Sequence, residues 1–139
     1  MTDKTYAGGC ACGNVRYQAT GTPVAELHCQ CLHCQKRSGT GHASYIVFAG
    51  RGAVSITGDA SIWRIAGDSG HEKSHGFCPT CGTPTHVTFA ASPDITAILP
   101  GSLDDPTIFQ PSFVTYGCRA LDWDRQDPAL TIIERGPVS

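Results

Sequence analysis

The stretch CQCLHC, residues 29–34, places three cysteines within one short segment of the chain. Two further stretches complete the pattern, CAC at residues 10–12 and CPTC at residues 78–81, so that together they hold seven of the eight cysteines. Zinc in proteins prefers four ligands in a tetrahedron, with thiolate sulfur at about 2.3 Å. The two pairs can close one four-sulfur site, whereas the group of three fills three positions of another site and leaves the fourth open.

Length and composition are those of one globular domain. The chain has 139 residues, of which 40% are hydrophobic and 16% charged. About two thirds of the unfolded surface can be buried at this size, which allows a hydrophobic core. We therefore expect a single zinc-binding domain over residues 1–139.

Charge and hydropathy exclude two classes of partner. The net charge is −2, with 10 basic and 12 acidic residues scattered along the chain, so no basic patch predicts nucleic-acid binding. The first residues have no apolar run typical of a secretory signal, and no segment approaches the ~20 apolar residues of a membrane span. A cytoplasmic location is expected, where thiols stay reduced and clustered cysteines indicate metal binding rather than disulfides.

The pattern of apolar residues predicts mainly β structure. Short runs rich in β-branched and aromatic residues, most of them separated by Gly or Pro, predict strands at 14–20, 43–49, 54–57, 61–65, 85–90, 95–99 and 112–116. Helical turns are expected over Leu32–Ser38 and again from Asp104, where Asp105 precedes a proline. The expected fold is a small antiparallel β domain with few short helical turns, stabilised by bound zinc.

The two cysteine pairs indicate a structural metal site. Cys78 and Cys81 are separated by two residues, a spacing that wraps a turn around one ion, and Gly82 can supply the positive φ of that turn. Cys10 and Cys12 form a shorter pair that is also followed by glycine. Metal binding at such sites contributes to folding, with apparent free energies on the order of 10–16 kcal/mol. The spacing alone leaves open whether the group of three shares ligands with either pair.

The group of three indicates a second, more reactive site. Cys29, Cys31 and Cys34 can aim three sulfurs at one ion from a loop that enters a helical turn. The candidates for a fourth ligand are the nearby histidines and the remaining thiol: His28, His33, His42 and Cys118. If none of them binds, water or a substrate sulfur takes the fourth position. Three thiolates suit a soft sulfur ligand, and a thiolate is the nucleophile that adds to an aldehyde.

These stretches resemble the motifs of one known family, the glutathione-dependent formaldehyde-activating enzymes, which also includes centromere protein V. The resemblance covers about residues 6–124. It rests on GCACGNVRY at 9–17, CQCLHCQKRSG at 29–39, FCPTCGTP at 77–84, GSLDDP at 101–106 and a tryptophan at 123. The sequence departs from the family pattern at Gln30, where a histidine is frequent.

The resemblance implies a β-tent fold with two zinc ions. It implies a structural zinc bound by four residues, Cys10, Cys12, Cys78 and Cys81. It implies that Cys29, Cys31 and Cys34 bind the zinc associated with carbon–sulfur lyase activity. The implied reaction joins a small thiol, glutathione, to formaldehyde as S-hydroxymethylglutathione, or cleaves that adduct. The alternative hypothesis is a non-catalytic binding module stabilised by zinc.

Two other features favour plainer interpretations. The string HEKSH at residues 71–75 has the spacing of a zinc-protease motif, which requires a helix. Glycines on both sides favour a polar loop or strand here. Arg37 follows the group of three and is a weak candidate for binding a substrate carboxylate, as are Lys36 and Arg119.

Overall fold

The computed structural model describes residues 4–67 and 70–136, so the two ends of the expected domain, 1–3 and 137–139, lie outside the described residues. Within that part the chain forms two sheets. The smaller has the order β1-β2-β5, from Tyr6–Gly9, Arg16–Ala19 and Val54–Thr57. The larger has the order β11-β10-β3-β4-β9-β8-β7-β6. Its strands are β3 (Ala25–Cys29), β4 (Ala43–Ala49), β6 (Ser61–Ala66), β7 (Glu72–Phe77), β8 (Pro84–Phe89), β9 (Ile95–Ile98), β10 (Phe113–Thr115) and β11 (Thr131–Ile132).

The expectation of a mainly β fold is confirmed, and the observed strands differ from the predicted ones in a few places. β4 and β5 begin and end as predicted, and five other strands lie within or next to their predicted ranges. β1 and β3 were not predicted, because they carry Gly, Ala, Glu or His where β-formers are expected. β11 was not predicted, because it has only two residues. The HEKSH string enters strand β7, in agreement with the plainer interpretation.

The sheets are mainly antiparallel, as expected, and one edge of the larger sheet adds parallel pairs. β10 runs parallel to β3 on one side and parallel to β11 on the other, whereas the other strand pairs are antiparallel. Parallel neighbours require long connections rather than hairpins. Most of the other strands lie between β3 and β10 in the sequence. Local sequence patterns do not reveal a pairing between strands so far apart in the chain.

The one α-helix of the described residues, α1, spans Leu32–Ser38 as predicted. Cys31 is its N-cap, with Sγ accepting from the backbone N–H of Cys34 at 3.4 Å. Gly39 ends the helix in the left-handed region, at φ 75°, and its N–H bonds to the carbonyl of Gln35.

Over residues 4–67 and 70–136 the chain also forms three 3-10 helices: η1 (Pro100–Ser102), η2 (Pro106–Ile108) and η3 (Gly117–Arg119). Asp105 caps η2, which confirms the second predicted helical turn. In the described ranges, none of the helices has the length and apolar character needed to span a bilayer.

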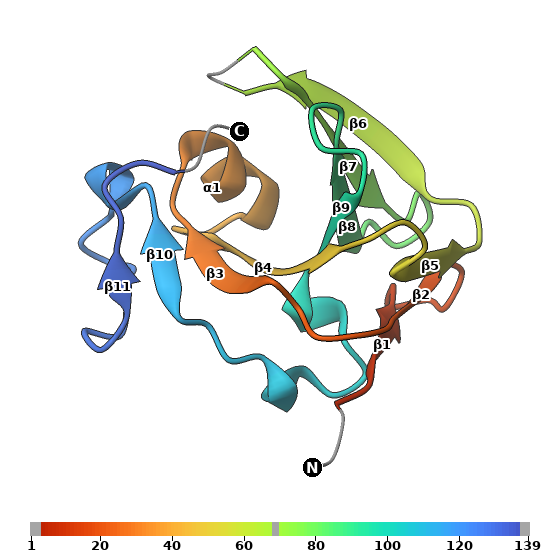
Figure 1. Ribbon diagram of the computed structural model, residues 1–139. Coiled ribbons are helices and arrows are strands. Elements are labelled where there is room, and N and C mark those ends of the chain that lie inside the picture. The colour runs from red at the N-terminus through yellow and green to blue at the C-terminus, as the bar shows by residue number, and fades with distance from the viewer. Residues whose placement is uncertain (1–3, 68–69, 137–139) are drawn as a thin grey trace.

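The two faces of β4 serve different purposes. Ile46 and Phe48 are fully buried in the main core, where they pack with Tyr6 and Tyr17 of the smaller sheet. Successive side chains of a strand point to opposite faces, so Tyr45 and Val47 face the other way. In Figure 1 the larger sheet curves from β10 and β3 round to β7 and β6, and α1 lies within the curve. The core thus stabilises one face of the sheet and leaves the other for a site.

Candidate metal centres and the adjoining cavity

The four paired cysteines come together in one cluster between the two sheets. Cys10 and Cys12 lie in the turn between β1 and β2, and Cys78 and Cys81 lie in the turn between β7 and β8. Their four sulfur atoms all lie within 4.8 Å of one another, and the Cys12 sulfur is 3.6 Å from that of Cys78. This four-cysteine cluster has the full ligand set of a tetrahedral metal ion.

Backbone and hydroxyl groups support the sulfurs of the four-cysteine cluster. The N–H of Val15 donates to the Cys10 sulfur at 3.2 Å, and the N–H of Thr80 donates to the Cys78 sulfur at 3.4 Å. The hydroxyl of Thr83 lies 3.2 Å from the Cys81 sulfur and also accepts from the N–H of Ala11. Gly82 has a φ of 78°, which confirms the predicted left-handed turn. Such donors stabilise thiolates and fix the positions of metal ligands.

The three remaining clustered cysteines also converge, as their spacing predicted. Cys29 ends β3, Cys31 caps α1 and Cys34 lies in the first turn of that helix. Their sulfur atoms lie within 4.8 Å of one another. The hydroxyl of Tyr45, on the neighbouring strand β4, lies 3.1 Å from the Cys34 sulfur. We call this group the three-cysteine cluster.

The three-cysteine cluster has an uneven distribution of charge when no cation is considered. Hydrogen bonds from Cys29 and Cys34 lower the pKa of Cys31 to about 2. Contact with Cys29, then with Cys31, raises the pKa of Cys34 far above its ordinary range. Negative charge is thus favoured on Cys31 and disfavoured on Cys29 and Cys34, because a second thiolate would be repelled by the first. A bound cation removes that repulsion and lets all three ionise, and soft thiolates suit zinc better than magnesium or calcium.

None of the four candidate ligands completes the three-cysteine cluster in the described part of the chain. His28 bonds to the hydroxyl of Ser44 at 2.7 Å, and His42 pairs with Asp124 at 2.6 Å. Cys118 is exposed in η3. His33 lines a cavity beside the cluster without joining the sulfur group. Among residues 4–67 and 70–136, the cluster therefore offers three ligands.

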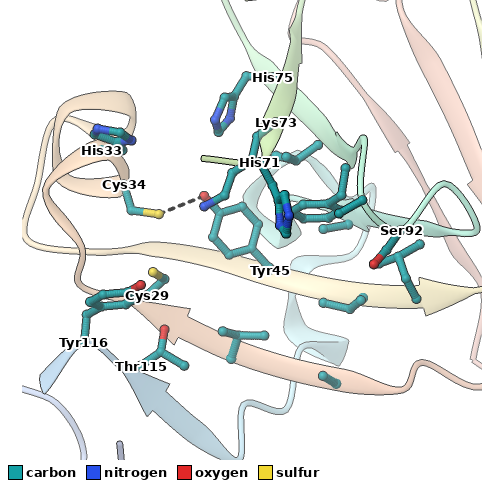
Figure 2. A pocket seen from close by; sticks show the side chains of 18 of the residues that line it. Cys29, His33, Cys34, Tyr45, His71, Lys73, His75, Ser92, Thr115 and Tyr116 are labelled. Atoms are coloured by element: carbon teal, nitrogen blue, oxygen red, sulfur yellow. Dashed lines mark hydrogen bonds between the residues drawn. The ribbon is translucent and has the colours of Figure 1, made fainter. Parts of the chain in front are cut away.

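A cavity of about 300 Å³ opens beside the three-cysteine cluster. Cys29 and Cys34 form part of its wall, together with Tyr45, Thr115 and Tyr116 (Figure 2). The rest of the sheet lining is largely aliphatic and aromatic: Ala25, Leu27, Val47, Val87, Phe89, Ile95, Ala97 and Phe113. Cavities of roughly 300–1,000 Å³ are typical of small-molecule sites. The cluster thus has a neighbouring space in which a ligand can reach its sulfur atoms.

Strand β7 and the residue directly before it supply polar side chains to the cavity, a role that the sequence did not predict. His71, Lys73 and His75 are two residues apart and all line the cavity, opposite α1 (Figure 2). Burial, then the charges of Arg37 and Lys73, lower the pKa of His75 to about 4. The signal was present in HEKSH, since in a strand alternate positions share a face. The HEKSH string was compared with a helical metal motif, and the alternation of its side chains in a strand was not used to predict a site.

The candidate carboxylate-binding residues do not line this cavity. The Arg37 guanidinium is 5.5 Å from the ring centre of Trp63 and 5.6 Å from that of Phe77. Neither Arg37 nor Lys36 nor Arg119 lines the large cavity. In this structure Arg37 therefore has a packing role, and Lys73 is the lysine that faces the cavity.

The fold and the two clusters define a small β protein with two cysteine groups, each able to hold a soft metal ion. Residues 5–119 match the family described as glutathione-dependent formaldehyde-activating enzyme, slightly offset from the expected 6–124. The chain belongs to this family. A crystal structure of a Rhodobacter sphaeroides protein has a similar fold, with a TM-score of 0.56 and 20% sequence identity over 70% of this chain and 87% of that one.

Proposed function

We propose that the protein is a zinc-dependent carbon–sulfur lyase that forms or cleaves a thiol–aldehyde adduct, with S-hydroxymethylglutathione as the reference substrate. One observation carries this proposal. The three-cysteine cluster offers three ligands at the wall of a cavity, so a substrate sulfur can approach the remaining position. The family to which the chain belongs supports glutathione as the thiol and formaldehyde as the aldehyde.

The two clusters are assigned different roles. Cys10, Cys12, Cys78 and Cys81 would hold a structural zinc, because four sulfurs complete its coordination. Cys29, Cys31 and Cys34 would hold a second zinc, which keeps a bound substrate thiol in its thiolate form. Both proposals fit a reduced, cytoplasmic environment.

The reaction requires one bond to break and one proton to move. In cleavage, the hydroxyl proton of the adduct passes to water, the O–H electron pair forms the second C–O bond of the aldehyde, and the C–S electron pair leaves with sulfur as a thiolate. The ammonium of Lys73 extends from β7 into the cavity and favours negative charge on that oxygen (Figure 2). Tyr45 contacts the Cys34 sulfur, and burial raises its pKa well above the ordinary value. Tyr45 thus keeps its proton and acts as a positioning residue for that sulfur.

Exchange spectroscopy tests the proposed function. Glutathione and formaldehyde combine reversibly without an enzyme, so the quantity to measure is the acceleration of their exchange by the zinc-loaded protein in NMR. We expect clear acceleration, lost in Cys34→Ser and kept in Cys118→Ser. Exchange at the uncatalysed rate, in protein that contains two zinc ions, would favour the alternative of a non-catalytic binding module.

A further inference from the structure

The cavity beside the three-cysteine cluster has an apolar floor that a one-carbon aldehyde does not need. A continuous row of paired residues crosses five strands of the larger sheet. Ala25 pairs with Val47, Val47 with Ala97, Ala97 with Val87, and Val87 with His75. All five residues line the cavity, and the two alanines leave space where larger side chains would fill it.

A second row lies between this floor and the cysteines. Phe113 of β10 pairs with Leu27 of β3, which pairs with Tyr45 of β4. The next row toward the cluster pairs Thr115 with Cys29. The lining therefore changes in order along the sheet, from sulfur and hydroxyl groups, through an aromatic and aliphatic row, to small aliphatic residues.

Ala97 and Val87 pack at the base of the floor, where they are 1% and 2% exposed. The apolar surface open to a ligand comes from their half-buried neighbours Leu27, Val47 and Phe113. Apolar surface of this kind favours an apolar ligand and gives no partner to a carboxylate or an amide. Glutathione carries two carboxylates and an ammonium group, whereas the polar groups of the cavity wall lie on α1 and on or beside β7, away from the floor's aliphatic residues: His33, His71, Glu72, Lys73 and His75. The charged ends of such a thiol fit the cavity mouth better than its floor.

We propose that the adduct on which this protein acts carries an apolar substituent of several carbons, which lies on the floor formed by Val47, Ala97 and Val87. This inference rests on the proposed function, because it places the adduct's sulfur at the three-cysteine cluster. The substituent can belong to the thiol or to the aldehyde. Both cases share one chemistry, an aliphatic or aromatic group in contact with the sheet.

Binding of matched thiols to the zinc-loaded protein tests the inference without turnover. The probes are 2-mercaptoethanol and 6-mercaptohexan-1-ol, which share both end groups and differ by four methylene groups. Burial of one methylene group increases affinity by about fourfold. With part of the chain buried, we expect the longer thiol to bind about tenfold more tightly and to shift the NMR methyl signals of Val47, Val87 and Ala97.

A cavity-filling variant provides the matched control. Ala97→Leu occupies the floor and leaves the cysteines and Lys73 in place. We expect it to remove the preference for the longer thiol, because the leucine side chain takes the space that the longer chain would occupy. Equal affinities of the two thiols for the unsubstituted protein, with no methyl shifts, would overturn the inference.

Turnover of three adducts then locates the substituent. The first is made from 2-mercaptoethanol and formaldehyde, the second from 6-mercaptohexan-1-ol and formaldehyde, and the third from 2-mercaptoethanol and hexanal. A rate advantage of the second adduct over the first assigns the apolar group to the thiol, and an advantage of the third assigns it to the aldehyde. Acceleration of the first adduct with no advantage for either other adduct overturns the inference and leaves the proposed function standing. A failure of all thiols to bind and of all adducts to react overturns both.

Discussion

The two cysteine clusters use the same ligand atom in different surroundings. The four-cysteine cluster joins the turn between β1 and β2 to the turn between β7 and β8, and so links the two sheets. It packs on Val15, Ile56 and Ala60, away from the large cavity. The three-cysteine cluster lies at the junction of β3 and α1, with two of its residues in the cavity wall. The number of ligands and the access to a cavity distinguish the two sites, since the residue type is shared.

We expect the four-cysteine cluster to contribute mainly to the stability of the fold and the three-cysteine cluster mainly to activity. Loss of a ligand from the four-cysteine cluster should loosen the connection between sheets that are otherwise joined mainly by the core around Phe48. Loss of a ligand from the three-cysteine cluster should leave that core and that connection intact. The two clusters should therefore respond differently to the same substitution.

The largest effect is expected for Cys78→Ser. Cys78 is fully buried and accepts two backbone N–H bonds, so its loss removes both a metal ligand and a packed sulfur. Since metal binding contributes to folding free energy at such sites, the free energy of unfolding should fall by at least about 4 kcal/mol. Urea denaturation measures this change, and metal analysis should show the loss of one ion per chain. Cys118→Ser is the matched control and should unfold as the unsubstituted protein does. Equal stabilities of the two variants would contradict a structural role for the four-cysteine cluster.

Cys34→Ser should give the opposite pattern. We expect adduct exchange to fall by more than about 100-fold, because loss of a direct ligand exceeds the effect of supporting residues. The free energy of unfolding should change much less than in Cys78→Ser. Metal analysis and denaturation on the same sample test both expectations. A variant that unfolds as readily as Cys78→Ser would show that both clusters stabilise the fold.

Tyr45→Phe tests whether the Tyr45 hydroxyl helps to position the Cys34 sulfur. The phenol contacts the Cys34 sulfur at 3.1 Å, and the substitution removes the hydroxyl while keeping the ring. We expect the zinc affinity of the three-cysteine cluster to fall by about tenfold, a typical cost for the loss of a residue that supports a ligand. Competition with a chromophoric chelator measures the affinity. The four-cysteine cluster serves as the internal control, since its affinity should not change.

The smallest effect is expected on the pH dependence of stability, through His75 in the cavity wall. His75 has an ordinary pKa of 6.5, which burial and then nearby positive charge lower to about 4 in the folded protein. Between these values the unfolded chain binds a proton that the folded protein does not, so stability falls as the pH drops from about 6.5 to about 4. The free energy of unfolding of His75→Gln should fall less than that of the unsubstituted protein over this pH range.

Urea denaturation at pH 7 and at pH 5 compares His75→Gln with the unsubstituted protein. Protonation of the cysteines affects both proteins, so the difference between them isolates His75. Identical losses of stability between the two pH values would show that His75 does not titrate as described.

The sequence predicted the clusters better than their surroundings. The position of α1 and the convergence of the three-cysteine cluster followed from short spacings. The grouping of the two distant pairs was implied by the family resemblance, since spacing alone left their partners open. The place of β10 beside β3 did not, because Leu27 and Phe113 are far apart in the chain and pair in parallel. The positions of Lys73 and His75 in the cavity wall were not predicted, for a related reason. Their role depends on which face of β7 turns toward α1, and that is decided by packing of the whole sheet.

The pairing of β10 between β3 and β11 has a consequence for self-association. A bare strand edge offers unpaired N–H and C=O groups to other chains, and short outer strands reduce that hazard. β11 consists of Thr131 and Ile132, beyond the family match that ends at residue 119. The segment after the shared family region thus covers the outer edge of β10 and ends the sheet with its shortest strand. A chain truncated before β11 would present β10 to its neighbours and would be more prone to aggregate.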